Sequence, residues 1–230
     1  MNYACSTLDL IKNLQPGEQS RDILVALMDS RDSYHRGEAV EKLATFPDDL
    51  VNEEVIGNVI NMARYDRNQF NRAWAFDFMS EHPNDHFDTF LLTTKPAEIK
   101  PPAEDAYTHA LYCMKDDSGA ALLTECAALV TRPMLRLGAL LALSYLNDRM
   151  HPDLVPYLWH RRWIVKLVAA SRITEALGSQ DTINTMREIQ ELLAQRLKRE
   201  RYPMIRESLE RSAAKLEALL SESLPSANSQ

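Results

Sequence analysis

Apolar residues recur along this chain at the three- and four-residue spacing that places them on one face of an α-helix. The spacing is clearest between residues 183 and 220, where two apolar stripes flank Pro203 and predict a helical hairpin. A partner-binding coiled coil is the alternative interpretation, which Pro203 disfavours. Alternation typical of strands is missing, and the turn dipeptides Asn-Gly, Asp-Gly and Gly-Gly do not occur. The pattern therefore predicts an all-α protein.

Residues that cap or break helices divide the chain into intervals of about 12–20 residues. Asn52 and Asn68 precede apolar stretches and suit the N-cap, and Pro133 stands at a first-turn position. We expect helices to begin near residues 6–7, 20, 32–33, 52, 68 and 132, and to end at 15–17, 46–49, 82–85 and 178–180.

One long connection departs from this rhythm. Residues 93–102 hold Pro96, Pro101 and Pro102, which predict an extended, stiff loop. Such a loop is either functional or a spacer within the domain. The polar tail at residues 223–230 is predicted to be disordered.

A loose repeat runs through the predicted helices. A basic residue is followed three positions later by a small residue, and 29 to 40 residues separate consecutive copies. Tyr107 replaces the base in the third copy, where we expect the pattern to break, and Leu209 replaces the small residue in the sixth. The six pairs are Arg36 and Ala39, Arg72 and Ala75, Tyr107 and Ala110, Arg136 and Ala139, Lys166 and Ala169, and Arg206 and Leu209.

This repeat resembles the HEAT-like (armadillo-type) helical repeat family, in which the second helix of each pair carries Arg followed by a small residue. Residues 132–143 are the best match. The resemblance implies an irregular right-handed α-α superhelix, a solenoid of about five to six helix pairs. It implies a single domain over residues 1–222, with a weaker final hairpin at 181–222. An irregular helical bundle is the alternative.

The register of the repeat predicts a binding face. With the small residue at zero degrees, positions −1, +2 and +6 lie on the opposite side of the helix, and the resemblance implies that they line a concave surface. Carboxylates among aromatic rings suit a basic, partly apolar segment of another protein. The alternative is an ordinary charged helix surface on which Trp74 covers a neighbour. The predicted partner-binding residues are Glu38, Glu41, Trp74, Asp77, Glu81, His109, Tyr112, Asp116 and Tyr145.

The formal charge of −7 is distributed unevenly. Residues 1–120 hold 11 Lys and Arg against 21 Asp and Glu, whereas residues 121–230 hold 15 against 12. An acidic first half disfavours nucleic acid as a partner and is compatible with a basic protein.

Composition also bears on location. The longest apolar runs are far shorter than a membrane span, and the N-terminus does not resemble a secretory signal. Three scattered cysteines, Cys5, Cys113 and Cys126, suit a reducing compartment. We therefore expect a cytoplasmic protein without a membrane segment.

A second cluster combines basic and aromatic side chains: Trp159, His160, Arg161, Arg162 and Trp163. It suits an acidic peptide or a phosphate, or else its tryptophans form the edge of the core. His82 and His86 have the spacing of a metal pair, but Pro83 breaks the helix that would align them. No spacing implies a metal or another cofactor, and no catalytic triad stands out.

These observations favour a non-catalytic protein-interaction scaffold, either an adaptor or an inhibitor of the immunity-protein type. The alternative is an enzyme on the same scaffold. Some DNA glycosylases with HEAT-like repeats place an aromatic surface and a carboxylate against a damaged nucleotide, as Trp74 and Asp77 would here. Some chromophore lyases also use such repeats.

Overall fold

The computed structural model describes residues 3–223, with side chains described for residues 7–222. The regular elements of this part are all helices, which confirms the all-α prediction. Ser223 ends the last helix, and the rest of the predicted tail lies outside the described residues. None of the described helices is long and apolar enough to cross a membrane.

The chain divides into two compact units, residues 1–125 and 126–230. The single domain predicted over residues 1–222 stays a prediction. The first unit contains α1 (Tyr3–Asn13), α2 (Glu18–Met28), α3 (Ser33–Ala44), η1 (Asp48–Leu50), α4 (Glu53–Tyr65), α5 (Gln69–Glu81), α6 (Asp85–Thr93), η2 (Pro96–Glu98), α7 (Glu104–Cys113) and most of α8 (Asp117–Ala128). The second contains α9 (Pro133–Leu146), η3 (Pro152–Trp159), α10 (Trp163–Arg172), α11 (Ile183–Arg199) and α12 (Pro203–Ser223).

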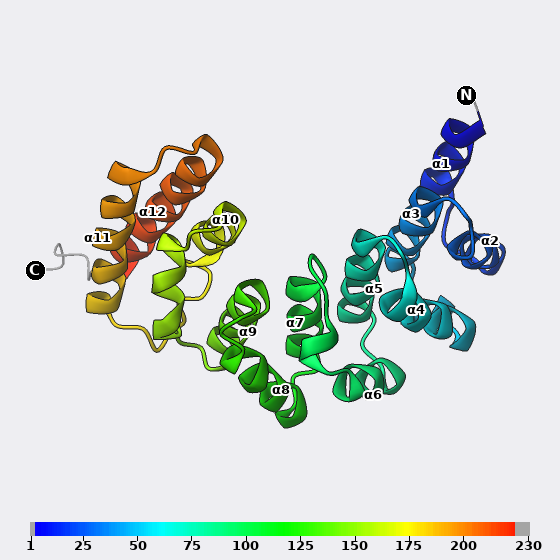
Figure 1. Ribbon diagram of the computed structural model, residues 1–230, viewed down its shortest axis with the longest axis horizontal. Coiled ribbons are helices and arrows are strands. Elements are labelled where there is room, and N and C mark those ends of the chain that lie inside the picture. The colour runs from blue at the N-terminus through cyan, green and yellow to red at the C-terminus, as the bar shows by residue number, and fades with distance from the viewer. Residues whose placement is uncertain (1–2, 224–230) are drawn as a thin grey trace, which may run out of the picture. The chain divides into compact units, whose positions relative to one another are not determined.

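In the first unit, consecutive helices pair and form two layers (Figure 1). The first helices of the pairs, α2, α4 and α6, form one layer, in which each packs on the next. The second helices, α3, α5 and α7, pack side by side in the other layer. The outer side chains of α3, α5 and α7 therefore share one surface.

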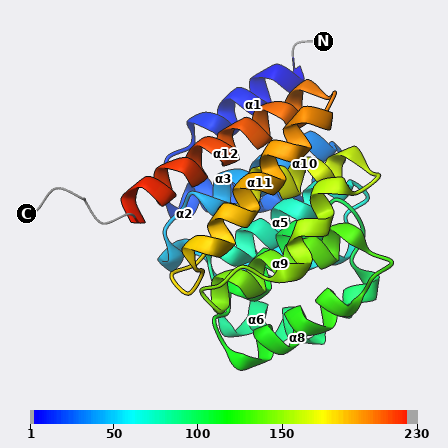
Figure 2. The ribbon, with the colours of Figure 1, turned by 90° about the vertical axis from the view of Figure 1, so that its left-hand side faces the viewer.

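In the second unit, α10 packs against η3, α9 and α12. The helices α11 and α12 form the hairpin predicted from the two apolar stripes (Figure 2). The first element of the α10 pair, η3, is a 3₁₀ helix that contains Pro152 and Pro156. Proline lacks the backbone N–H that an α-helix interior needs, which accounts for the tighter and shorter element.

Local capping explains which predicted boundaries are right. Asp32, Asn52 and Asn68 accept backbone N–H groups at the starts of α3, α4 and α5, and α9 begins at Pro133. The helices α1 and α2 begin earlier than predicted, at Tyr3 and Glu18. No helix breaker separates these residues from the predicted starts, so each helix extends back beyond them.

The small residues of the repeat lie where the register places them. The five alanines and the leucine of the sixth copy are all buried, and at the alanines the helices can approach closely. They are Ala39, Ala75, Ala110, Ala139, Ala169 and Leu209.

The proline-rich connection at residues 93–102 is less extended than predicted. It contains η2 and buries Pro96 and Ile99 against the first unit. The peptide bond between Pro101 and Pro102 is cis. Burial of two apolar side chains holds this connection against the helices.

Candidate functional site

At three basic positions of the repeat, the side chain ties the second helix to the end of the first helix of its pair. The last carbonyl groups of a helix have no partner within it, and a guanidinium group donates to them here. The donor and acceptor pairs are Arg72 Nη1 and Asp66 O at 2.6 Å, Arg136 Nε and Ala127 O at 2.7 Å, and Arg206 Nη1 and Leu197 O at 3.3 Å.

Tyr107, where the pattern was expected to break, keeps the same contact with a different group. Its hydroxyl donates to Thr94 O at 3.1 Å, at the end of α6. The helix-end contact is missing instead at Lys166, whose ammonium group lies 3.4 Å from Glu200 Oε2. The corresponding carbonyl, Leu158 O at the end of η3, instead accepts from Arg196 Nε at 2.7 Å.

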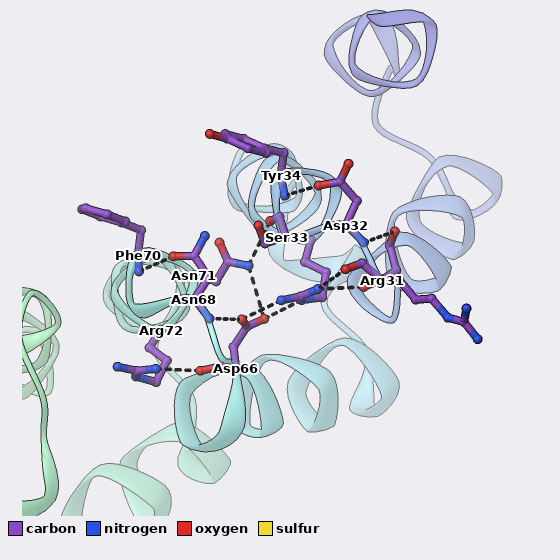
Figure 3. Close-up of polar contacts among 11 residues, drawn as sticks. Arg31, Asp32, Ser33, Tyr34, Asp66, Asn68, Phe70, Asn71 and Arg72 are labelled. Atoms are coloured by element: carbon purple, nitrogen blue, oxygen red, sulfur yellow. Dashed lines mark hydrogen bonds and ion pairs between the residues drawn. The ribbon is translucent and has the colours of Figure 1, made fainter. Parts of the chain in front are cut away.

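Asp66 is the centre of the densest polar network in the first unit (Figure 3). Its carboxylate accepts from Arg36 Nε at 2.6 Å and Nη2 at 2.8 Å, from Asn68 N at 2.7 Å and from Asn71 Nδ2 at 3.2 Å. Burial alone would raise the pKa of Asp66, but these hydrogen bonds outweigh it and hold the pKa below its usual value. The network joins one helix pair to the next, so we assign it a structural role.

The residues predicted to bind a partner lie largely on the shared surface of α3, α5 and α7. Most come from these three neighbouring helices. Asp116 differs, because it lies between α7 and α8 and its carboxylate accepts from Gly119 N at 2.7 Å as a cap. Tyr145 belongs to the second unit, where its hydroxyl lies 3.5 Å from Glu175 Oε2.

Trp74 packs against the neighbouring helix α3. A Cβ atom added at Gly37 would lie 2.0 Å from Cζ3 of the Trp74 ring. The indole therefore covers the backbone of Gly37 and stays only partly exposed. This packing leaves little of the ring available to stack on a nucleotide.

Carboxylates converge around Asp77 on α5. Burial, followed by the charges of Asp105 on α7 and Glu81, raises the pKa of Asp77 to about 6. Within the described part of the chain, neither Asp77 nor Glu81 forms an ion pair with a basic residue. The charges of Asp77 and Glu81 are therefore not neutralised by an ion pair within the described residues.

Sequence reasoning missed three members of this surface. Asp105, Tyr34 and Phe70 stand five positions before the small residues of their helices, which places them in the same sector as positions −1, +2 and +6. The rings of Tyr34 and Phe70 are 70% and 55% exposed, and Figure 3 shows both projecting to one side. Extending the register by one turn would have found all three.

We call this surface the acidic-aromatic face. On α7 it is completed by His109 and Tyr112, whose rings stack with centroids 6.2 Å apart. Its members are Tyr34, Glu38, Glu41, Phe70, Trp74, Asp77, Glu81, Asp105, His109 and Tyr112.

The predicted basic-aromatic cluster lies on the surface of the second unit, at the turn between η3 and α10. Trp159, Arg161, Arg162 and Trp163 are all exposed. The His160 ring stacks on Tyr157, with centroids 6.1 Å apart, which fixes the start of this turn.

The first unit also contains a cavity of about 550 Å³ between the ends of α4 and α6 and the proline-rich connection. Phe76 and Phe90 stack in its wall with centroids 6.1 Å apart, and the Arg64 guanidinium lies 4.8 Å above the Phe90 ring. Arg72 and Lys100 line it as well. The connection at residues 93–102 therefore forms part of a cavity wall rather than a bare spacer.

Metal-binding chemistry finds no support in the described residues, which contain no group of three His, Cys, Asp or Glu suited to a metal ion. Both ring nitrogens of His82 have protein neighbours, with Asp48 Oδ1 2.6 Å from Nδ1 and Ala44 O 3.0 Å from Nε2. Comparisons with models of known families, with curated proteins and with solved structures found no match.

Proposed function

We propose that this chain is a protein-interaction scaffold of HEAT-like helix pairs, and that its acidic-aromatic face binds a basic segment of another protein. The observation that carries the proposal is the group of carboxylates at Asp77. Burial and the neighbouring charges of Asp105 and Glu81 raise the pKa of Asp77, and no basic side chain forms an ion pair with Asp77 or Glu81 among the described residues.

A cationic side chain from a partner would relieve this repulsion. It would favour ionised Asp77, so binding and loss of the Asp77 proton are coupled. The exposed rings of Tyr34 and Phe70 offer apolar contact and a face for a cation. A basic segment with interspersed apolar residues meets both requirements.

The repeat supports the HEAT-like part of the proposal. Five alanines and Leu209 are buried at equivalent positions, and Arg72, Tyr107, Arg136 and Arg206 donate to carbonyls at equivalent helix ends. Equivalent contacts in successive pairs are typical of helical-repeat proteins, whose extended surfaces commonly bind other proteins. An adaptor and an immunity-type inhibitor both belong to this class.

The experiment uses a fluorescein-labelled peptide that alternates Arg and Leu, titrated with the full chain and followed by fluorescence polarisation. We expect the double variant D77N/E81Q to weaken binding about tenfold, which corresponds to about 1.4 kcal/mol. Affinity of the natural chain should rise as pH increases through about 6, because Asp77 then ionises.

The matched control is E53Q/E54Q, which removes two exposed carboxylates from α4. It should bind the peptide like the natural chain. If both double variants weakened peptide binding equally, binding would depend on the net charge of the chain and not on Asp77 and Glu81. That result would contradict the proposal. Absence of binding at low salt would contradict it outright.

A further inference from the structure

Three successive turns lie along one edge of the second unit. Residues 129–132, 160–162 and 200–202 each join the first element of a helix pair to the second, so they lie at the same end of their pairs. Val130 and His160 line one cavity of about 290 Å³, which brings the first two turns together. Lys166 Nζ, in the first turn of α10, lies 5.3 Å from the centroid of the Tyr202 ring, which brings the start of α10 next to the third turn.

These turns and the helix residues beside them, within segments 129–136, 159–166 and 198–204, expose six large apolar side chains, and we call this surface the turn edge. Buried apolar side chains stabilise a fold, so exposed ones gathered at one edge call for an explanation beyond folding. The exposed fractions are 72% for Val130, 39% for Trp159, 50% for Trp163, 41% for Ile164, 58% for Tyr202 and 61% for Met204.

The same turns are strongly basic. Glu200 is the single carboxylate in segments 129–136, 159–166 and 198–204. Glu200 is buried and accepts from Arg196 Nη2, from Arg201 N at 2.8 Å and from Tyr202 N at 2.9 Å. It is therefore occupied and does not neutralise the exposed cations, which are Arg161, Arg162, Lys198, Arg199 and Arg201.

The opposite edge of the second unit differs in charge. The turns that join one pair to the next, at residues 147–151 and 177–182, contain Asp148 and Asp181. Asp148 accepts from Ser179 N at 2.9 Å, and Asp181 accepts from Met150 N at 2.8 Å. Leu146 is the one exposed large apolar side chain next to these turns, so the exposed apolar side chains described in the second unit are concentrated at the turn edge.

We infer that the turn edge is a second docking surface and that it binds an acidic, partly apolar segment of another protein. Trp, Tyr, Met and Arg are the residues enriched at protein interfaces, and Arg forms paired hydrogen bonds with carboxylates. Val130, Ile164 and Met204, half of the six exposed apolar side chains, are aliphatic and offer no ring for a base to stack on, which favours a protein segment over a single-stranded nucleic acid.

A membrane surface is a less suitable partner for the turn edge than an acidic protein segment. Membrane-surface binding typically uses the continuous apolar face of an amphipathic helix. Here the apolar side chains come from three separate turns and alternate with arginines. The two surfaces, one acidic and one basic, would make the chain an adaptor, and docking at the turn edge does not depend on the proposed function of the acidic-aromatic face.

The test uses the full chain and a labelled peptide that alternates Glu with Leu and Phe. We expect measurable binding that weakens about tenfold or more in the W163A/M204A variant, because truncated aromatic and apolar anchors dominate interface energies. R161Q/R162Q should also weaken binding and reduce its dependence on salt. Both pairs of side chains are exposed, so circular dichroism and thermal unfolding should show an intact fold.

L146A/R149Q is the matched control, because Leu146 and Arg149 are exposed at the opposite edge of the same unit. It should bind like the natural chain. Failure of the natural chain to bind the acidic peptide would overturn the inference. So would loss of binding in R64Q/K100Q, which would place the peptide at the cavity of the first unit instead.

Three further measurements identify other occupants. Tighter binding to phosphatidylserine vesicles or to a thymidine oligonucleotide, lost in W163A/M204A, would replace the acidic segment with a membrane or a nucleic acid. Sedimentation that shows self-association, also lost in W163A/M204A, would assign the edge to a second copy of the chain. Each result would overturn the inference, while the basic-peptide titration continues to test the acidic-aromatic face separately.

Discussion

A single missing side chain sets how closely two helices of the first unit approach. Gly37 on α3 leaves room for the Trp74 ring of α5, and a Cβ atom would lie 2.0 Å from Cζ3 and 2.6 Å from Cε3 of that ring. Such distances are far below van der Waals contact, so any larger residue must displace the indole. Packing at this position and the shape of the acidic-aromatic face therefore depend on the same glycine.

We predict that Gly37→Ala lowers the free energy of unfolding by about 1–3 kcal/mol, the usual cost of overpacking. Urea unfolding followed by circular dichroism measures it. Gly57→Ala on α4 is the control, since nothing lies within 4 Å of its added Cβ. That change should stabilise by up to about 1 kcal/mol through helix propensity. Equal stability of the Gly37 variant and the natural chain would contradict the described packing.

Asp77 predicts a pH dependence with a definite sign. Its folded pKa of about 6 exceeds the ordinary value of 3.8, so the folded state holds the proton more tightly than the unfolded state. The resulting stability is fully present below about pH 4 and is lost as pH rises through about 6. Asp77→Asn should therefore raise stability at pH 7 by about 1 kcal/mol, a value reduced by solvent screening of this partly exposed group.

Thermal unfolding between pH 4 and pH 8 checks this expectation. The melting temperatures of Asp77→Asn and the natural chain should differ at pH 7 and converge near pH 4. Glu54→Gln, which removes an exposed carboxylate, should not reproduce the difference. A constant offset at every pH would show that Asn acts through packing and not through the charge of Asp77.

At the scale of helices, the repeat works by joining helix ends. A donor on α5, α7, α9 and α12 supplies a hydrogen bond to a carbonyl that the preceding helix cannot satisfy. The donor need not be charged, because the Tyr107 hydroxyl takes the place of a guanidinium group. These equivalent positions share the contact with a helix end, whereas the residue type differs among them.

Tyr107→Phe tests this contact. The ring is buried and meets Phe76 edge to face with centroids 5.4 Å apart, so phenylalanine keeps the packing and removes only the hydroxyl. We expect a loss of about 1–2 kcal/mol in the free energy of unfolding, since Thr94 O loses its donor. Tyr202→Phe is the control, because Tyr202 is exposed and should tolerate the change.

Features that depend on a few neighbouring residues could be predicted from the sequence. Asn52 and Asn68 cap helices through their own next turn, and Ala39 and Ala75 are buried because the helical period places them inward. Contacts between distant residues could not be predicted. The burial of Trp74 depends on Gly37, 37 positions earlier, and the convergence of Asp77 with Asp105 depends on how α5 and α7 pack.

At the scale of the molecule, charge is sorted by unit and by edge. The first unit carries the acidic-aromatic face, and the second carries the exposed arginines of the turn edge. Opposite charges on separate surfaces allow one chain to recognise two partners and to reject the wrong one at each surface. If both proposed docking surfaces bind partners, this arrangement favours an adaptor over an inhibitor, which needs only one surface.

If residues 1–222 form the single domain predicted, the two units should unfold together. In a helical-repeat array that unfolds as one domain, each pair stabilises its neighbours and both units lose structure together. Tryptophan fluorescence in W159F/W163F reports on Trp74 alone, and fluorescence in W74F reports on Trp159 and Trp163. The two urea midpoints should coincide. Separate midpoints would show two independently folding domains.

The hydrogen bond of Arg196 determines where the chain can be shortened without loss of a helix-end contact. Arrays of repeats commonly gain and lose members as whole helix pairs. Arg196 of α11 donates to Leu158 O of η3, 38 positions earlier, so the pair that contains η3 is completed by the pair that follows it. Deleting the last pair alone would leave that carbonyl without its donor. We therefore expect a chain shortened by the last pair alone to lose stability in η3 and α10, which Arg196 ties to that pair.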